Sequence, residues 1–435
     1  MIRKIVLIAI LLLLFVPFLG CKKETDTQVP VIVLNSPTEN QPYNVFEEIA
    51  VTGTVYDNQQ LTYVRIQLLD EQMTPVLPPV LLEPEENNYT LNQAYALDDV
   101  LLKTGHYYLQ VQAHDGIQAT NKYVALQITA APKQLSFIVA VTKSGSQLSV
   151  VKIDSAFQTT TLFTVNSDYL GSGVYNDHGL FYLGGSYSGD ITVYDMSIWQ
   201  QEWNVPVTIS PPSAWFTGMM VSGGYLWVGY RNGKYEKYDY YGNNKMAINT
   251  LTGWAPRKFC LVGNKLVVEE KSNTGPETEL TVRFEFSGAI DGDYYITENT
   301  VDMIPIDETN LCHITNTTTG QAHLYLFNTD ILDEEEPSST LGTGKAYCAV
   351  PVGSNIIIGH DQGVYWFSPD HLTTTLWLSG VSARALFRDE TQGWIVAGQG
   401  NQLKIFLDNF PSVTTVQTVT LSDSIVAVHG VYNKD

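Results

Sequence analysis

A repeated unit runs through residues 132–435 and limits what this part of the chain can form. Each copy has two short runs of alternating apolar and polar residues around a polar, mostly Gly-containing turn, as in LFYLGGSYSGDITVYD at residues 180–195. Copies begin at residues 137, 180, 225, 265, 311, 355 and 393, so successive starts are 38 to 46 residues apart. A period of about 40 to 50 residues is typical of a four-stranded β-propeller blade. The sequence therefore predicts a seven-bladed β-propeller over residues 132–435.

The period has a physical cause. An isolated hairpin cannot bury both of its faces, whereas a four-stranded blade stacked between two neighbours can. The alternative is a β-sandwich, because sandwiches also repeat their turns, about every 8 to 12 residues. A regular sevenfold repeat favours the propeller, and in either case the fold class is all-β.

Six of the seven units end with a short acidic or amide side chain. Such a side chain can accept a hydrogen bond from the backbone two residues further on, which suits a tight turn into the next strand. We therefore predict turn-forming roles for Asp154, Asp195, Asp239, Asn328, Asp370 and Asp408. The fourth unit lacks this residue.

Each blade also needs an inner strand before the repeated hairpin. Apolar segments precede most of the units, for example GSGVYN before Leu180 and KAYCAV before Asn355. No such segment precedes Phe137, but the chain ends with SIVAVHGVY at residues 424–432. We predict that this stretch is the inner strand of the first blade, so that the C-terminal strand closes the propeller.

The N-terminus has the features of an export signal. Arg3 and Lys4 precede an apolar run at residues 5–16. The run is shorter than the roughly 20 residues of a membrane-spanning helix and has the basic flank of a signal peptide. We therefore read residues 1–20 as a signal peptide that is removed from the folded protein.

The four residues that end at Cys21, FLGC, resemble the lipobox of bacterial lipoproteins, with Phe18 where Leu is usual. The resemblance implies cleavage before Cys21, lipidation of Cys21 and a lipidated tether over residues 21–28. An ordinary secreted protein whose first mature residue is Cys is the alternative. The following residues, KKETDTQ, resemble the export tags of surface lipoproteins in Bacteroides-like bacteria. We expect an outer-membrane lipoprotein displayed at the cell surface or otherwise on the periplasmic face, with the membrane as a partner through its lipid anchor.

The charge of the chain restricts its other partners. The sequence has 24 Lys and Arg against 45 Asp and Glu, a net charge of −21. Such a surface repels phosphate backbones, so we expect no nucleic-acid partner. Three cysteines remain besides Cys21, namely Cys260, Cys312 and Cys348, and their separations fit no zinc motif. We expect them to be buried free thiols.

Residues 29–131 differ from the repeat region. Short alternating runs such as IAVTGTVYD at residues 49–57 and GHYYLQVQAHD at residues 105–115 are separated by turn signals, which fits a sandwich of about seven strands. Several of these segments resemble strands of bacterial immunoglobulin-like domains. The resemblance implies an immunoglobulin-like β-sandwich over residues 29–131, acting as a spacer between the tether and the propeller.

The predicted strand order places two kinds of loop on one face of the propeller: the turns inside the repeated hairpins and the links between blades. Aromatic side chains beside Arg, Asn, Gln and Asp are what a sugar or peptide site needs. The candidate ligand-binding residues in these loops are Tyr169, Tyr187, Trp215, Tyr230, Arg231, Trp254, Arg257, His360, Asp361 and Arg384. The alternative is that the aromatic residues only cap the ends of the blades.

One blade carries a more specific resemblance. The segment VYDMSIWQQEW at residues 193–203 is similar to the repeat of quinoprotein-like propellers, in which an Asp begins a tight turn and a Trp eight residues later packs between blades. Asp195 and Trp203 occupy these places. The resemblance implies the fold and the packing between blades, without a bound quinone, and we expect no cofactor.

Sequence motifs for catalysis or metal binding are missing. The chain has no Gly-x-Ser-x-Gly elbow, no His-Glu-x-x-His helix and no phosphate-binding Gly loop. His313 and His323 flank one hairpin, but two ligands do not make a metal site. We therefore assign no catalytic and no metal-ligating residues.

Two functions remain open. The preferred one is a lipid-anchored extracytoplasmic binding protein whose propeller face captures a glycan or a protein. The alternative is an extracytoplasmic polysaccharide-processing enzyme of the lyase or glycosidase type acting at the same face, since propeller enzymes bring catalytic groups together from different blades and leave no linear motif.

Overall fold

The computed structural model describes residues 28–84, 86–208, 214–337 and 341–435. These residues form β-strands, turns and two short 3₁₀ helices, η2 (Asn176–His178) and η3 (Pro369–His371). No helix in these ranges has the length and apolar character needed to cross a membrane. The signal peptide, Cys21 and nearly all of the predicted tether lie outside the described residues.

The chain divides into two compact units, Met1–Pro132 and Lys133–Asp435. The first unit contains two sheets. Their strand orders are β1(Val31–Ser36), β3(Glu48–Tyr56), β6(Asn88–Ala96) and β2(Gln41–Asn44), β8(Ala119–Thr129), β7(Gly105–His114), β4(Tyr63–Leu69), β5(Val80–Leu82). Alternate residues of both sheets, such as Ile49, Val51, Leu109 and Val111, belong to one apolar core. Burial of these side chains stabilises the unit by roughly 25 cal/mol per Å² of apolar area removed from water.

The described residues of the second unit form seven four-stranded antiparallel sheets. The strands of the first three sheets, from the innermost outward, are β36(Ser424–Tyr432), β9(Leu135–Ser144), β10(Gln147–Ile153), β11(Thr159–Asn166); β12(Gly171–Tyr175), β13(Leu180–Gly184), β14(Ile191–Asp195), β15(Gln200–Val205); and β16(Phe216–Ser222), β17(Tyr225–Tyr230), β18(Lys234–Tyr238), β19(Asn244–Asn249).

The strands of the remaining four sheets follow in the same order. They are β20(Trp254–Val262), β21(Lys265–Ser272), β22(Thr278–Phe284), β23(Ile290–Ile296); β24(Asn299–Pro305), β25(Asn310–Asn316), β26(Ala322–Asn328), β27(Asp333–Glu335); β28(Ala346–Val352), β29(Asn355–His360), β30(Gly363–Ser368), β31(Thr373–Ser379); and β32(Ala385–Asp389), β33(Trp394–Gln399), β34(Gln402–Leu407), β35(Thr415–Thr420).

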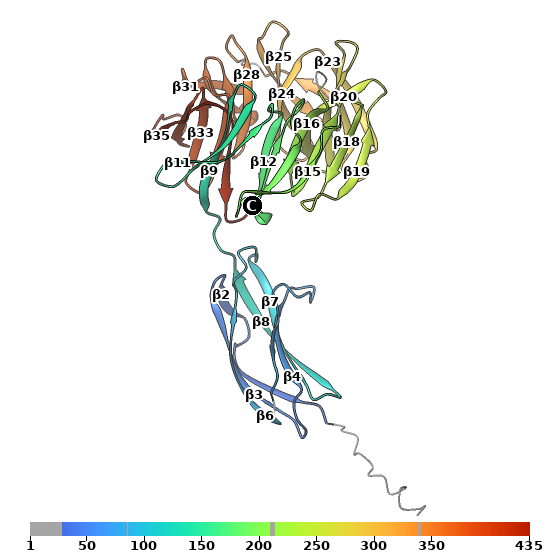
Figure 1. The fold of residues 1–435 in the computed structure, drawn as a ribbon, viewed down its shortest axis with the longest axis vertical. Coiled ribbons are helices and arrows are strands. Elements are labelled where there is room, and N and C mark those ends of the chain that lie inside the picture. Colours follow the sequence, from blue (N-terminus) through green and yellow to red (C-terminus); the bar gives the residue numbers. More distant parts are fainter. Residues whose placement is uncertain (1–27, 85, 209–213, 338–340) are drawn as a thin grey trace, which may run out of the picture. The chain divides into compact units, whose positions relative to one another are not determined.

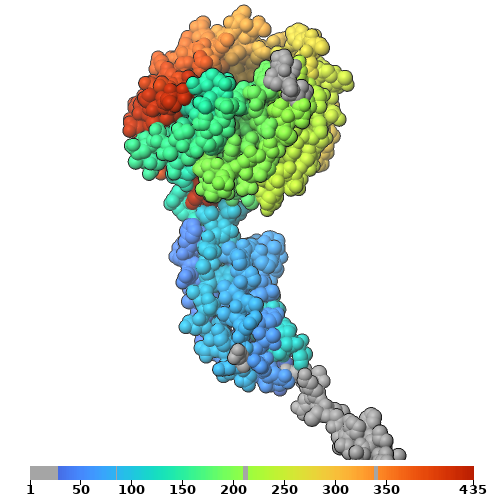
Figure 2. Space-filling view, viewed as in Figure 1, coloured from blue at the N-terminus to red at the C-terminus, as the bar shows by residue number. Residues whose placement is uncertain are grey.

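The innermost strands form a closed ring, in which β12, β16, β20, β24, β28, β32 and β36 each contact the next and β36 contacts β12. This arrangement is a β-propeller, as the repeat predicted. The C-terminal strand β36 pairs with β9 in antiparallel register, Gly430 opposite Ile138, so the predicted closure is present. Figure 1 shows the dark red C-terminal strand beside the teal strand β9, and Figure 2 shows the red and teal segments in contact at the surface.

Apolar clusters hold neighbouring sheets together. One cluster combines Ile138 and Ile153 of the first sheet with Val396 and Ile405 of the seventh, across the junction between the two ends of the repeat. Trp203 of β15 packs in the cluster between the second and third sheets, and its indole N–H donates to the carbonyl of Tyr240 at 3.0 Å. The predicted packing of Trp203 between blades is therefore confirmed.

The short side chains that end the units make most of the predicted turn hydrogen bonds. Carboxylate or amide oxygens of Asp154, Asp195, Asp239 and Asn328 accept from the backbone N–H two residues later, at 2.7 to 3.0 Å. Asp408 differs, because its carboxylate accepts from Arg388 Nε at 3.0 Å. Asp370 lies in η3.

Removal of β36 should disrupt the propeller. A chain that ends at Asp423 loses the apolar side chains of Ile425, Val428 and Val431, which are 2 to 5% exposed, and leaves the inner edge of β9 unpaired. We expect the cooperative thermal unfolding transition of the propeller to be lost in calorimetry. A control chain that lacks only Lys434 and Asp435 keeps β36 and should retain the cooperative transition. An unchanged melting temperature after deletion to Asp423 would contradict this role of β36.

The turn at Asp239 should make stability depend on pH. Burial acts to raise the pKa of Asp239, but hydrogen bonds from Asn243 and the ion pair with Lys245 outweigh it and hold the pKa below its usual value. A lowered pKa stabilises the fold above the unfolded-state value, and this contribution disappears as the pH falls through the folded-state pKa. Asp239→Ala should cost about 1–3 kcal/mol at pH 7, and the loss should shrink below about pH 4. Denaturant titrations at pH 7 and at about pH 3 measure the change in the free energy of unfolding. Glu202→Ala, at an exposed position, is the control.

Candidate functional site

The antiparallel strand order places the turns between second and third strands, and the links from one sheet to the next, at the same edge of the propeller. We call this edge the link face. The ten candidate residues from the sequence lie in these turns and links or in the strand ends beside them. Their exposure differs, however, and divides them into three groups.

Tyr230 and His360 lie in the protein interior, which corrects their assignment as ligand-binding residues. Tyr230 is 6% exposed, and its hydroxyl donates to Glu236 Oε2 at 2.7 Å. His360 is 0% exposed, and burial lowers the pKa of its imidazole. Both residues end a second strand, β17 or β29, where the side chain turns toward the core.

Tyr169, Trp215 and Trp254 are half-buried, as the capping alternative for the aromatic residues requires. The Tyr169 hydroxyl is 3.0 Å from Ser172 Oγ, and burial raises the pKa of Tyr169 to about 12. The Trp215 ring lies edge-on to Tyr230 with 5.4 Å between ring centroids. The backbone of Trp215 donates to Ser186 and accepts from Arg231, so it joins the turns of two neighbouring sheets.

Tyr187, Arg231, Arg257, Asp361 and Arg384 are exposed at the link face. Asp361 belongs to a separate cluster, because its carboxylate accepts from the Tyr347 hydroxyl at 2.5 Å and the Arg384 guanidinium lies 4.6 Å above the Tyr347 ring. The backbone N–H of Lys345, followed by the Tyr347 hydroxyl, lowers the pKa of Asp361.

Asp168, which the sequence reasoning missed, fixes the turn that carries Tyr187. Its carboxylate accepts hydrogen bonds from the backbone N–H groups of Ser186, Tyr187 and Ser188 at 3.0 to 3.1 Å. Burial acts to raise the pKa of Asp168, but these bonds outweigh it and lower the pKa. An Asp in the link before a Gly and Ser-rich turn is the sequence signal that could have revealed this contact.

Five of the innermost strands contain a bulge near the link face. The register with the second strand skips one residue in each, namely Thr217, Arg257, Val301, Tyr347 and Val426. A bulge breaks the alternation of side chains and re-aims them. Arg257 is the extra residue between Pro256 and Lys258, and both Arg257 and Lys258 are exposed, although neighbours in a regular strand point to opposite sides.

A pocket of about 300 Å³ brings two of the candidate residues together. Four consecutive sheets contribute to its lining, from the second to the fifth. The polar and aromatic lining residues are Ser186, Tyr187, Phe216, Thr217, Arg257, Lys258, Glu269, Asn299 and Thr300. Tyr187 is 46% exposed beside the cations Arg257 and Lys258. We call this pocket the candidate site.

A row of hydrogen bonds supports the candidate site at Thr300. Thr300 Oγ1 is 3.0 Å from His313 Nε2, and His313 Nδ1 is 2.5 Å from Glu334 Oε1. These contacts fix the orientation of the Thr300 hydroxyl group at the candidate site. His313 is 0% exposed, so it positions Thr300 and does not meet a ligand itself. Glu269 Oε1 accepts from the Thr300 backbone N–H at 3.2 Å.

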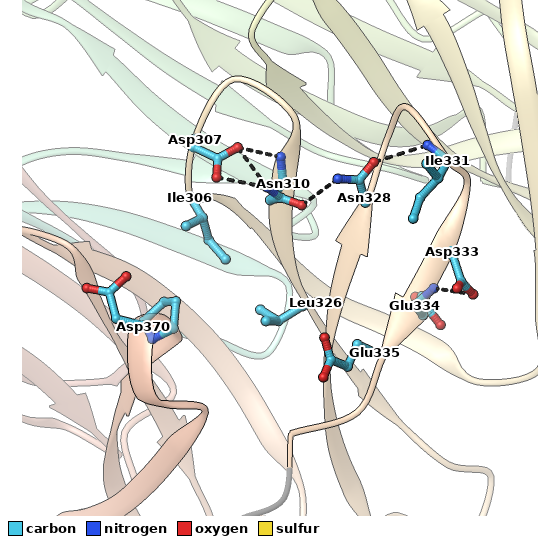
Figure 3. A pocket seen from close by; sticks show the side chains of 11 residues that line it. Ile306, Asp307, Asn310, Leu326, Asn328, Ile331, Asp333, Glu334, Glu335 and Asp370 are labelled. Atoms are coloured by element: carbon cyan, nitrogen blue, oxygen red, sulfur yellow. Dashed lines mark hydrogen bonds between the residues drawn. The ribbon is translucent and has the colours of Figure 1, made fainter.

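A second hollow of about 390 Å³ lies at the opposite edge of the fifth and sixth sheets (Figure 3). Its acidic lining residues are Asp307, Asp333, Glu334, Glu335 and Asp370. Several already have partners, since Asp307 accepts from Asn310 and Glu334 lies against His313. Within the described ranges, no group of three His, Cys, Asp or Glu is placed to hold a metal ion.

The three cysteines outside the N-terminal region are free, as predicted. Cys260 and Cys312 are buried and Cys348 is half-buried. Burial raises the pKa of Cys260 to about 12 and raises the pKa of Cys312 and Cys348 as well. A thiol with a raised pKa is a poor nucleophile, so these residues do not suggest thiol chemistry.

No family model matches the chain, and no curated protein matches it. Similar solved structures include the computationally designed protein Ika8, with a TM-score of 0.48 and 11% identity over 68% of this chain and 90% of that one. A quinoprotein alcohol dehydrogenase-like protein from Bacteroides thetaiotaomicron has a TM-score of 0.41 and 13% identity over 93% of this chain and 99% of that one. BamB from Moraxella catarrhalis has a TM-score of 0.40 and 12% identity over 68% and 93%. Similarities this low carry no information on ligand or activity, and the propeller fold rests on the sheet topology.

Loss of the Asp168 carboxylate should loosen the turn at the candidate site. In Asp168→Ala, the backbone N–H groups of Ser186, Tyr187 and Ser188 lose their acceptor. We expect their hydrogen exchange to become at least about tenfold faster, because local opening becomes easier. The internal control is the backbone N–H of Asp361, which donates to the carbonyl of Lys345. Both residues adjoin strands of the sixth sheet, away from Asp168. Unchanged exchange at Ser186 to Ser188 would show that Asp168 does not hold this turn.

Proposed function

We propose that the protein is a lipid-anchored extracytoplasmic binding protein that captures a glycan at the candidate site. The supporting observation is the pocket of about 300 Å³ at the link face, in which an exposed Tyr187 ring lies beside Arg257, Lys258 and Thr300. An aromatic ring offers a flat apolar surface to a sugar ring, and the surrounding donors and acceptors bind its hydroxyl groups. Because four sheets line the pocket, the propeller presents it on a rigid frame.

Binding accounts for this pocket better than hydrolysis. Most glycosidases use two carboxyl groups about 5 to 10 Å apart. Among the residues that line the candidate site, Glu269 alone carries a carboxylate, and it is 4% exposed with a hydrogen bond from Thr300. The arrangement therefore favours capture of a ligand over the glycosidase type of the enzymatic alternative.

The proposal extends to the other parts of the chain. The propeller has seven blades, one for each four-stranded sheet, and the unit before it is an immunoglobulin-like spacer. The FLGC segment ending at Cys21 and the apolar run before it support export, lipidation and outer-membrane display at the cell surface. A spacer between a lipid anchor and a binding domain would hold the candidate site away from the membrane.

A glycan screen with matched tyrosine variants tests the function. Tyr187→Ala removes the exposed ring of the candidate site, whereas Tyr241→Ala removes a 70% exposed ring from a turn at the opposite edge. We expect wild type and Tyr241→Ala to bind the same glycans, and Tyr187→Ala to bind them about tenfold more weakly. Trp215 and Trp254 are unsuitable for this test because they are half-buried.

Two results would contradict the proposal. Absence of glycan binding by the wild-type protein would remove a glycan as the ligand. Shortened glycan products detected by mass spectrometry after incubation would favour the enzymatic alternative.

A further inference from the structure

We propose that the candidate site selects a carboxylated sugar, such as a uronate unit of an acidic polysaccharide, whose carboxylate is bound by Arg257 and Lys258. This inference rests on the proposed glycan-binding function and specifies the chemical class of the glycan. Three features of the pocket carry it: two cations without a salt-bridge partner among the described residues, the bulge that exposes both of them, and the hydroxyl, amide and aromatic groups beside them.

Arg257 and Lys258 are adjacent cations in an acidic protein, which has 45 Asp and Glu against 24 Lys and Arg. Six of the 20 described Lys and Arg side chains form a salt bridge with a carboxylate, as Lys237 does with Glu285 and Lys265 with Asp291. Arg257 and Lys258 form no salt bridge with any described residue, although they are neighbours in the chain and line the same pocket. Two adjacent like charges repel each other, and a bound carboxylate would relieve the repulsion. The planar guanidinium of Arg257 suits a carboxylate, with which it can form two parallel hydrogen bonds.

The backbone holds the bulge in place. The Thr217 hydroxyl of the neighbouring sheet donates to the Pro256 carbonyl at 2.5 Å, directly before Arg257. Gly218 lies against the same segment, where an added Cβ would come within 2.1 Å of the Arg257 carbonyl oxygen. Only glycine permits this approach of the two backbones. The cations are therefore presented from a fixed backbone, which lowers the entropic cost of binding a ligand.

Asp302, a half-buried acid, lies near Lys258. Burial raises the pKa of Asp302, the effect of Lys258 opposes this shift, and the Asp302 carboxylate accepts from the backbone N–H groups of Ala349 and Met303. Lys258 is exposed and lines the pocket.

The rest of the pocket distinguishes a sugar from a simple anion. Thr300, held by His313, presents a hydroxyl group that can form a hydrogen bond with a sugar hydroxyl group. Asn299 adds an amide, and the Tyr187 ring offers an apolar surface for a sugar ring. A ligand with one carboxylate, several hydroxyl groups and a flat apolar face matches these features together.

Titration calorimetry with three carboxylated polymers tests the inference: polygalacturonate, alginate and hyaluronate. Fully methyl-esterified pectin is the matched neutral probe, since it has the backbone of polygalacturonate without the charge. We expect at least one acidic polymer to bind, with affinity that decreases as salt increases, and its neutral counterpart to bind at least about tenfold more weakly.

Variants assign the charge selection to the pocket. Arg257→Gln and Lys258→Met should each lower the affinity for the acidic polymer by about tenfold or more. Lys345→Met, which removes an exposed cation of the link face outside the pocket, should bind as the wild type does. Thermal unfolding of each variant verifies that the propeller is intact.

The outcomes separate this inference from the function on which it rests. Binding of neutral glycans that depends on Tyr187, without binding of any acidic polymer, would overturn the carboxylate selection and leave the glycan-binding function standing. Equal affinity for polygalacturonate and methyl-esterified pectin would overturn it as well. No binding of any glycan, acidic or neutral, would overturn both. Arg257-dependent binding of a peptide with a free C-terminal carboxylate, and of no polymer, would also overturn both, in favour of a protein partner.

Discussion

The pairing of β36 with β9 is the contact on which the propeller depends. It joins Ser424–Tyr432 to Leu135–Ser144, and the ring of innermost strands closes only because the last strand of the chain occupies the first sheet. Without it, the first sheet would expose an inner edge and the apolar cluster between the first and seventh sheets would open to water. The inner end of every sheet, and thus every turn at the link face, takes its position from this closed ring.

Short polar side chains then shape the loops at both edges. Asp239 organises a turn at one edge, and Asp168 binds three successive backbone N–H groups at the link face. The half-buried aromatic Trp215 connects neighbouring turns through its backbone. Such contacts leave few residues free to meet a ligand, and they explain why most aromatic residues of the link face belong to the framework while Tyr187 remains exposed.

The candidate site arises where a bulge interrupts this regular framework. Strand alternation would send Arg257 and Lys258 to opposite sides, but the extra residue in β20 exposes both. The neighbouring sheet contributes Thr300 of β24, which is held by His313 of β25, itself in contact with Glu334 of β27. A charged part and a neutral polar part are thus placed side by side in one pocket, which is the basis for selecting a ligand that carries both kinds of group.

The sequence alone determined the all-β class, the order of strands within each sheet, the closure by residues 424–432 and the turn roles of Asp154, Asp195 and Asp239, because each follows from local alternation and a fixed period. The sequence also predicted that the turns inside the hairpins and the links between sheets lie together at the link face, because the strand order places both at the same edge. Only the tertiary structure decided which of those residues face solvent. Tyr230 and His360 point inward, the bulge at Arg257 depends on pairing register, and the contacts of Thr300, His313 and Glu334 join strands far apart in the chain. Exposure, register and cross-strand contact are properties of packed sheets, and no single segment encodes them.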